Sequence, residues 1–242
     1  MKLYGVGVGP GASDLLTVRA LAILRAVDVI ALPRASEWGE SMAWSIVAPA
    51  LGEARAEKLF LTFPMQKDPE VVQPALGRAM DAIGERLRAG KSVAFATEGD
   101  PSLYSTFIYV AEEARRRWPD VEIEVVPAVS SPLAVAAVAG LPLADGQERI
   151  AIVPANYGVD DLDRVLAMFD TVVLMKIGPE MPRIIAGLER AQLLDRAVYV
   201  AKATMREQRI VRDLRQVAAE RGDCFAMVVV AKKERAGVLV RA

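Results

Sequence analysis

Short apolar runs alternate with longer amphipathic stretches along the first half of the chain. Runs of this length are typical of buried strands, whereas apolar positions recurring every three or four residues are typical of helices. The runs that predict strands begin at residue 2 and cover residues 28–32, 57–63, 93–96 and 122–126. Helical spacing covers residues 14–25, 36–51, 70–89, 105–118 and 132–139. This alternation, with short connections, predicts an α/β fold built on a doubly wound parallel sheet.

The second half of the chain has a different pattern. Its apolar runs are separated by polar or helical segments and predict strands at residues 149–154, 171–176, 197–201 and 224–230, with residues 237–241 as a candidate edge strand. Glycine, proline and other small residues make Gly140–Gly146 look like a connector. We therefore expect two α/β domains, residues 1–130 and 131–242, with a junction near residues 130–146.

Three predicted strand ends in the first half run into turns of small residues. These turns are Gly7–Gly11, Thr97–Tyr104 and Pro127–Ser131. Because an open parallel sheet binds ligands at the carboxyl ends of its strands, the turns are candidates for one crevice. In the second turn, Gly99 would let a ligand approach the backbone, Asp100 would stand at the mouth of the crevice, and Tyr104 would begin the next helix. A simpler alternative is that Asp100 only caps that helix.

The first turn also fits a dinucleotide-binding pattern. Gly7, Gly9 and Ala12 match G-x-G-x-x-G/A between a predicted strand and a predicted helix. That fold places an acidic residue at the end of the second strand, where it binds the ribose, and here the second strand ends in Pro33-Arg34. A nicotinamide-dependent oxidoreductase is therefore an alternative that lacks the expected acidic residue. A tight turn that binds no ligand is a further alternative.

Composition narrows the class of protein. The chain is 53% hydrophobic and 25% charged, and its 30 Lys and Arg nearly balance its 31 Asp and Glu, whereas a nucleic-acid-binding face needs a basic excess. The single cysteine, Cys224, excludes an intrachain disulfide framework and suits a reducing compartment. No apolar run reaches about 18 residues, the length that a membrane-spanning helix needs. We expect a cytoplasmic protein that binds neither nucleic acid nor membrane.

The chain contains no histidine. It therefore lacks the commonest metal ligand and the commonest general base. The lack of histidine disfavours a zinc or other tightly bound metal site. Hydrolases that depend on histidine are excluded. Carboxylates, tyrosine, lysine and one cysteine remain for proton transfer, so we expect chemistry that depends on positioning and on a reactive cosubstrate, with no metal required by the protein.

Three separated pieces of the chain resemble one family. Gly7–Gly11, Gly99–Tyr104 and Val173–Lys176 occur in the order and spacing of the tetrapyrrole methylases, the S-adenosylmethionine-dependent enzymes of the cobalamin and sirohaem pathways. The likeness spans nearly the full chain. Within the family, Phe63–Met65 followed by Asp68 resembles the branch that methylates C20 of precorrin-2 to give precorrin-3A. A branch acting on the cobalt-bound substrate, another corrin-ring methylase and diphthine synthase are the alternatives inside the family.

The resemblance implies a cosubstrate site, a cleft between two α/β domains and a homodimer. Pro10 would line the S-adenosylmethionine pocket, and Gly99, Asp100 and Leu103 would hold the amino-acid and ribose end. Further contacts are implied at Ser130 and Ser131 after the fifth strand and at Met175 and Ala203 in the second domain.

The chain departs from the family's usual residues at several positions. Ala12 replaces a common acidic residue, Glu98 stands where glycine or leucine is common, and Ala128 replaces a usual glycine. The second strand ends in Leu32-Pro33, whereas the sirohaem enzymes tend to have Tyr-Asp there. The difference at the end of the second strand disfavours the sirohaem branch.

Methyl transfer from a sulfonium to carbon is an in-line displacement, and an electron-rich tetrapyrrole carbon is already a nucleophile. The protein would mainly align the reacting atoms and exclude water. A proton must later leave C20 for a carboxylate, Tyr104 or solvent, and the sequence selects none of them. Arg34 and Lys67 are candidates to bind the substrate's carboxylates because each follows a predicted strand, although either could be ordinary surface charge.

Overall fold

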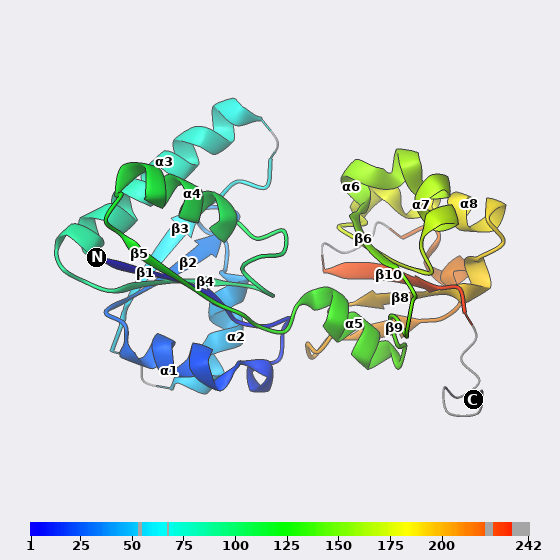
Figure 1. Ribbon diagram of the computed structural model, residues 1–242, viewed down its shortest axis with the longest axis horizontal. Helices are drawn as coiled ribbons and strands as arrows, with labels where there is room; N and C mark the ends of the chain where they lie inside the picture. The colour runs from blue at the N-terminus through cyan, green and yellow to red at the C-terminus, as the bar shows by residue number, and fades with distance from the viewer. Residues whose placement is uncertain (53–54, 67, 221–224, 234–242) are drawn as a thin grey trace. The chain divides into compact units, whose positions relative to one another are not determined.

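The structure, a computed structural model, describes residues 1–52, 55–66, 68–220 and 225–233. The chain divides into two compact units, Met1–Ser131 and Pro132–Ala242, each built around a five-stranded sheet (Figure 1). Within these described ranges, no helix combines the length and the apolar character that crossing a bilayer requires. Cys224 and the candidate edge strand at residues 237–241 lie outside the described residues.

The first unit is a doubly wound parallel sheet, as the alternation predicts. Its strand order is β3-β2-β4-β1-β5, and all neighbouring strands are parallel. The strands are β1 (Lys2–Gly7), β2 (Val29–Arg34), β3 (Glu57–Thr62), β4 (Val93–Thr97) and β5 (Glu122–Val126). Helices α1 (Val18–Ala26) and α2 (Met42–Leu51) cover one face, and α3 (Pro69–Arg88) and α4 (Phe107–Arg117) cover the other (Figure 1).

The central strand β4 is buried on both faces. Val93 and Phe95 pack into the core under α3 and α4, whereas Ala94 and Ala96 pack into the core against α1 and α2. Side chains on a strand alternate between the two faces of its sheet, which explains this division. Because β4 is buried on both faces, its sequence shows a continuous apolar run rather than an alternation of apolar and polar residues.

Helix α3 shows how sequence signals set an element's ends. Its N-cap, Asp68, accepts a hydrogen bond from the backbone N–H of Glu70 at 3.0 Å, and proline occupies the first helical position. The helix buries an apolar stripe that includes Met80, Ile83 and Leu87. Gly90 follows the helix with a φ of 80°, a conformation that favours glycine.

The second unit holds a mixed sheet in the order β6-β7-β10-β8-β9. Its strands are β6 (Ile150–Pro154), β7 (Thr171–Met175), β8 (Ala197–Ala201), β9 (Arg209–Val211) and β10 (Ala226–Ala231). Only the β6–β7 pair is parallel among these five strands. Helices α6 (Ala155–Gly158), α7 (Leu162–Met168) and α8 (Met181–Arg190) lie on one face, and α5 (Ser131–Ala139) lies on the other (Figure 1).

Some element boundaries differ from the sequence-based predictions. The helix predicted from residue 36 begins at Met42, because Ser41 accepts a hydrogen bond from the backbone N–H of Trp44 at 3.4 Å and residues 35–40 form a loop. The helix predicted from residue 14 is a 3-10 turn, Ser13–Leu15, followed by α1. The short strand β9 was not predicted.

Candidate functional site

The turns after β1 and β4 are joined by backbone hydrogen bonds. The N–H of Val8 donates to the carbonyl of Thr97 at 2.9 Å, which continues the β1–β4 pairing beyond the strands. Gly9 and Gly99 then exchange two bonds, with N···O distances of 3.3 and 2.8 Å. The glycine-rich turn and the Gly-Asp-Pro turn therefore form one rigid feature at the carboxyl edge of the first sheet.

Glycine is required at several points of this feature. Gly9 and Gly99 have φ values of 83° and 66°, in the left-handed region that side chains disfavour. A Cβ at Gly7 would lie 2.6 Å from the Cβ of Ala128 and 2.8 Å from the carbonyl oxygen of Gly99. The ends of β1, β4 and β5 thus approach too closely for a side chain at Gly7, and the three predicted turns meet at one edge.

Asp100 joins the second turn to the third. One carboxylate oxygen accepts the backbone N–H of Ala128 at 2.8 Å, and the other accepts the backbone N–H of Ser102 at 2.9 Å and also the Ser102 hydroxyl. Burial raises the pKa of Asp100, but the bonds from Ser102 and Ala128 lower it by more, so the pKa lies below its usual value. Asp100 does not cap the next helix, which begins at Phe107.

The residues predicted to bind the cosubstrate in the first unit surround this feature. Pro10 is buried in the first turn, and the N–H of Leu103 donates to the Asp100 carbonyl at 3.2 Å. Ser130 and Ser131 are half-buried after β5. A Cβ at Gly99 would meet only the backbone nitrogen of Ser131, at 4.0 Å, so this side of the turn is open. Small residues and open space here fit a ligand that lies against the backbone.

Arg34 ends β2 beside the same edge. Strands β2 and β4 pair only as far as Ala31 and Phe95, and they lead to helices on opposite faces, which defines the ligand-binding switch point of such a sheet. The Arg34 guanidinium lies over the Phe60 ring at 5.5 Å, and its Nε is buried without a hydrogen-bond partner in the described structure. Such an unpaired donor suits an anionic ligand group.

The other two predicted substrate contacts have different outcomes. Tyr104 is 44% exposed and has a φ of 51°, and it lies in the turn three residues before α4. The prediction that Tyr104 begins the helix is wrong, because Ser105 accepts the backbone N–H of Phe107 at 3.1 Å and starts the helix later. Lys67 lies outside the described residues.

Glu98 is the residue of this edge whose role the sequence did not suggest. It lies between the buried strand β4 and Gly99, is half-buried, and has no hydrogen bond or ion pair with any residue that the structure describes. Burial raises the pKa of Glu98 to about 7. The available signal was an acidic residue two positions after a continuous apolar run.

The second unit gathers its predicted residues at one sheet edge. Met175 ends β7 and Ala203 follows β8, and both belong to one buried cluster together with Met227. Strands β7 and β8 are both antiparallel to β10, so their carboxyl ends share an edge. Lys176 and Lys202, directly after these strands, have φ values of 54° and 50°. Left-handed backbone at residues other than glycine costs energy and is often found at functional sites.

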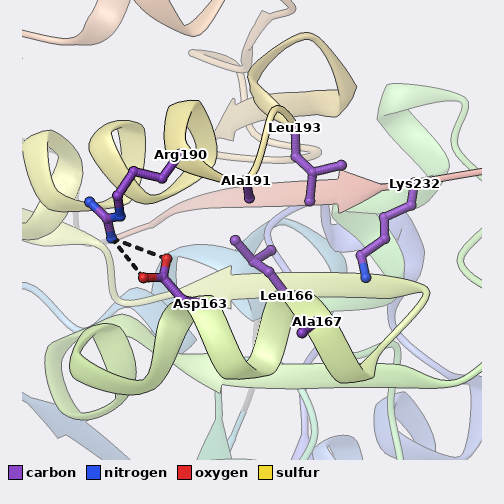
Figure 2. Close-up of a pocket in the computed structure, with 7 residues that line it drawn as sticks. All are labelled: Asp163, Leu166, Ala167, Arg190, Ala191, Leu193 and Lys232. Carbon is purple, nitrogen blue, oxygen red and sulfur yellow. Dashed lines mark hydrogen bonds and ion pairs between the residues drawn. The ribbon is translucent and has the colours of Figure 1, made fainter.

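A shallow groove between α7 and α8 lies elsewhere (Figure 2). Its charged groups are largely matched, since Arg190 contacts both carboxylate oxygens of Asp163 at 3.1 Å. Lys232, also in the groove, follows β10, whose last residue pairs with Thr171 at the start of β7. The groove therefore lies at the edge opposite Met175 and carries no evident chemistry.

The family model described as tetrapyrrole (corrin/porphyrin) methylases matches residues 2–218 of the chain. The chain belongs to this family. A cobalt-precorrin-2 C(20)-methyltransferase of Salmonella typhimurium is 34% identical over 96% of the chain and 97% of its own length. A precorrin-2 C(20)-methyltransferase of a Sinorhizobium species is 31% identical over 95% of this chain and 94% of its own length.

Solved structures agree with membership in the tetrapyrrole methylases. The X-ray structure of a cobalt precorrin-4 methyltransferase superposes with a TM-score of 0.70 at 26% identity, covering 95% of this chain and 94% of its own. The uroporphyrin-III C-methyltransferase of Thermus thermophilus, complexed with S-adenyl homocysteine, gives 0.69 at 23% identity, with 96% and 98% covered. The second likeness speaks for the fold alone.

The dinucleotide interpretation of Gly7, Gly9 and Ala12 is not supported. Dinucleotide-binding sheets place their first strand between the second and the fourth, in the order 3-2-1-4-5-6. Here β4 lies between β2 and β1. Strand order and family membership together favour a methylase over a nicotinamide-dependent oxidoreductase.

Proposed function

We propose that this tetrapyrrole methylase transfers the methyl group of S-adenosylmethionine to C20 of precorrin-2, giving precorrin-3A during corrin-ring biosynthesis. The observation that carries the proposal is similarity over 94–97% of the length of two relatives that are named for this position, C20. The carboxyl edge of the first sheet supports it, because the turns there offer open backbone, an anion-binding side chain and a carboxylate.

The chain's own residues would hold the cosubstrate, which supplies an electrophilic methyl group. The small side chains of the joined turns leave the backbone accessible, and the Asp100 carboxylate keeps the turns in place. We assign the cosubstrate contacts in the first unit to Pro10, Gly99, Asp100, Leu103, Ser130 and Ser131, and those in the second unit to Met175 and Ala203. A fixed orientation of the methyl group would contribute to the rate enhancement, since alignment alone is worth several kcal/mol.

Arg34 is the proposed anchor for the substrate. Precorrin-2 carries many carboxylates, and a guanidinium binds a carboxylate through two parallel hydrogen bonds. The contact between Arg34 and the Phe60 ring restrains the side chain before the substrate arrives, and the buried Nε gains a partner when it does. Tyr104 and Lys67 are assigned to the substrate as further contacts.

A second candidate substrate is cobalt-precorrin-2, in which the metal belongs to the substrate. The Salmonella typhimurium relative is named for the cobalt form, as is a Methanocaldococcus jannaschii relative that is 38% identical over 72% of both chains. The Sinorhizobium relative is named for precorrin-2 without cobalt. Both forms present the same carbon, so both are included in the test.

We further propose that the enzyme works as a cytoplasmic homodimer and holds no metal of its own. Tyr109 on α4 and Val125 on the edge strand β5 are 61% and 47% exposed, and they supply apolar surface for a second subunit. Light scattering of the purified protein at micromolar concentration is expected to give twice the chain's mass. A mass equal to one chain would contradict the dimer.

The experiment is an anaerobic assay with S-adenosylmethionine and either metal-free or cobalt-bound precorrin-2. We expect release of S-adenosylhomocysteine and a pigment heavier by one methyl group with at least one of the two substrates. The faster of the two identifies the natural metal state. Tight binding of S-adenosylmethionine with no methyl transfer to either substrate would keep the fold and overturn the proposed reaction.

A further inference from the structure

The position of Glu98 follows from the alternation along β4. Thr97, the last residue of the strand, hydrogen-bonds to the hydroxyl of Ser105 at 2.8 Å and so faces α4. The next side chain faces the opposite side of the sheet, where Ala94 and Ala96 pack against α1 and α2. Glu98 therefore stands at the carboxyl edge, directly before Gly99 and Asp100, which are assigned to the cosubstrate.

The elements around this face bring little charge to Glu98. Helix α2 contains no ionisable residue, and the arginines of α1 are engaged, Arg19 with Glu124 and Arg25 with the carbonyl of Ala50. On β2 and β3, the Arg34 guanidinium lies over Phe60 and the Lys58 ammonium lies over Trp44. On β1, Lys2 pairs with Glu122 and Glu124. The neighbouring loops carry Asp14, Glu37 and Glu40, which are exposed. Burial rather than a charged partner therefore raises the pKa of Glu98 to about 7.

The proposed reaction must release a proton. C20 uses its π electrons to form a bond to the methyl carbon while the methyl–sulfur bond breaks, and that electron pair returns to sulfur as a neutral thioether. C20 then carries both a hydrogen and the new methyl group. Loss of the hydrogen as a proton returns its bonding pair to the ring and restores conjugation, so a base has to accept one proton per turnover.

We propose that the Glu98 carboxylate accepts the proton that leaves C20. The inference rests on the proposed function and adds the catalytic base that neither the sequence nor the comparisons identify. The Glu98 carboxylate stands at a rigid strand end, beside the turn that would orient the methyl group. No protein group in the described structure forms a hydrogen bond or ion pair with it.

The other acceptors at this edge suit the role less well. Both carboxylate oxygens of Asp100 accept hydrogen bonds, and its lowered pKa makes it a weak base. Tyr104 lies 44% exposed in a turn, so it is open to solvent rather than held in a buried site. A base works best when its pKa is near the working pH, and Glu98 meets that condition.

The test compares Glu98→Gln with the wild type in single turnover across the pH range around neutrality. We expect the affinity for S-adenosylmethionine to change less than about twofold and the rate of formation of the C20-methylated product to fall by about 10²–10⁴-fold. The wild-type rate should decrease below an inflection near pH 7, and the variant should lose this inflection. If the wild type forms product more slowly from a substrate that carries deuterium at C20, proton loss contributes to the observed rate.

Two further variants separate a base from a structural residue. Glu98→Asp keeps a carboxylate and should retain the pH inflection at a reduced rate, whereas Glu112→Gln, an exposed residue of α4, should behave as wild type. A wild-type rate and pH profile in Glu98→Gln would overturn the assignment of the base and leave the proposed function intact. Absence of C20 methylation by the wild type would overturn both.

Discussion

At the scale of single residues, Glu98 couples the stability of the first unit to pH. Its pKa is raised from 4.5 to about 7 by burial, so the folded chain holds the proton more tightly than the unfolded chain. This tighter binding of the proton stabilises the folded chain fully at pH values below the pKa of Glu98 in the unfolded chain. The stabilisation is lost as the pH rises through the pKa of Glu98 in the folded chain. The full loss is about 3 kcal/mol, at roughly 1.4 kcal/mol per pKa unit.

Glu98→Gln removes this dependence. We expect the variant and the wild type to have similar free energies of unfolding at about pH 4, and the variant to be more stable by up to about 3 kcal/mol at about pH 8. Urea unfolding at the two pH values measures the difference. An equal difference at both values would show that Glu98 ionises normally in the folded chain. A residue that costs stability where a base is needed is a common compromise at active sites.

Asp100 is the second residue whose single replacement should affect both stability and binding. Asp100→Ala removes the acceptors of the Ala128 and Ser102 N–H groups, and we expect it to lower the free energy of unfolding by about 1–3 kcal/mol and to weaken S-adenosylmethionine binding. Asp100→Asn, which keeps one acceptor oxygen, should lose less of both. Denaturant unfolding and calorimetric titration provide the two readouts, and unchanged values in Asp100→Ala would remove its proposed role.

At the scale of elements, the site depends on how closely the ends of β1, β4 and β5 approach. Gly7→Ala would place a Cβ 2.6 Å from the Cβ of Ala128, and separating the strand ends should cost about 1–3 kcal/mol and reduce affinity for the cosubstrate. In the control Gly77→Ala, on α3, the new Cβ meets only Arg117 at 3.9 Å. That change should be neutral or stabilising by up to about 1 kcal/mol.

Urea unfolding with and without S-adenosylmethionine compares the two glycine variants. Equal stability and equal ligand-induced stabilisation in Gly7→Ala and the wild type would mean that the strand ends can separate without consequence. The control variant guards against a general effect of adding a methyl group to this unit.

Most strands could be predicted from the sequence because each is a compact apolar run between turn residues. The start of α2 could not be predicted, because Trp38 fits the helical spacing although it lies before the helix. The helix begins only after Ser41, whose hydroxyl caps it. Strand β9 is three residues long and mostly exposed, which leaves no periodic signal. A helix start or an edge strand of this kind is decided by capping and by tertiary pairing.

The site was predictable in part for the same reason. Turns of glycine and proline after apolar runs indicate a ligand edge, and the structure brings Gly7, Gly99 and the end of β5 together there. The bond from Ala128 to Asp100 joins residues 28 positions apart, which no local pattern reveals. The buried state of Glu98 depends on the packing around β4, so its altered pKa could be found only in the folded chain.

At the scale of the whole molecule, the proposed cosubstrate contacts come from both units. Met175→Ala should weaken S-adenosylmethionine binding by at least tenfold and also cost about 2–5 kcal/mol, because Met175 is buried. Met181→Ala, in the core on the other face of the second sheet, should cost a similar amount of stability with little effect on affinity. Titration calorimetry well below both unfolding temperatures compares them, and equal affinities would restrict the site to the first unit.

The position of the new methyl group tests the central claim most directly. The product formed from S-adenosylmethionine carrying a ¹³C-labelled methyl group and precorrin-2, in either metal state, would be examined by carbon NMR. We predict one enriched methyl signal coupled to C20 and none on any other ring carbon. Enrichment at a different carbon, or an unlabelled pigment after S-adenosylmethionine has bound, would contradict the account.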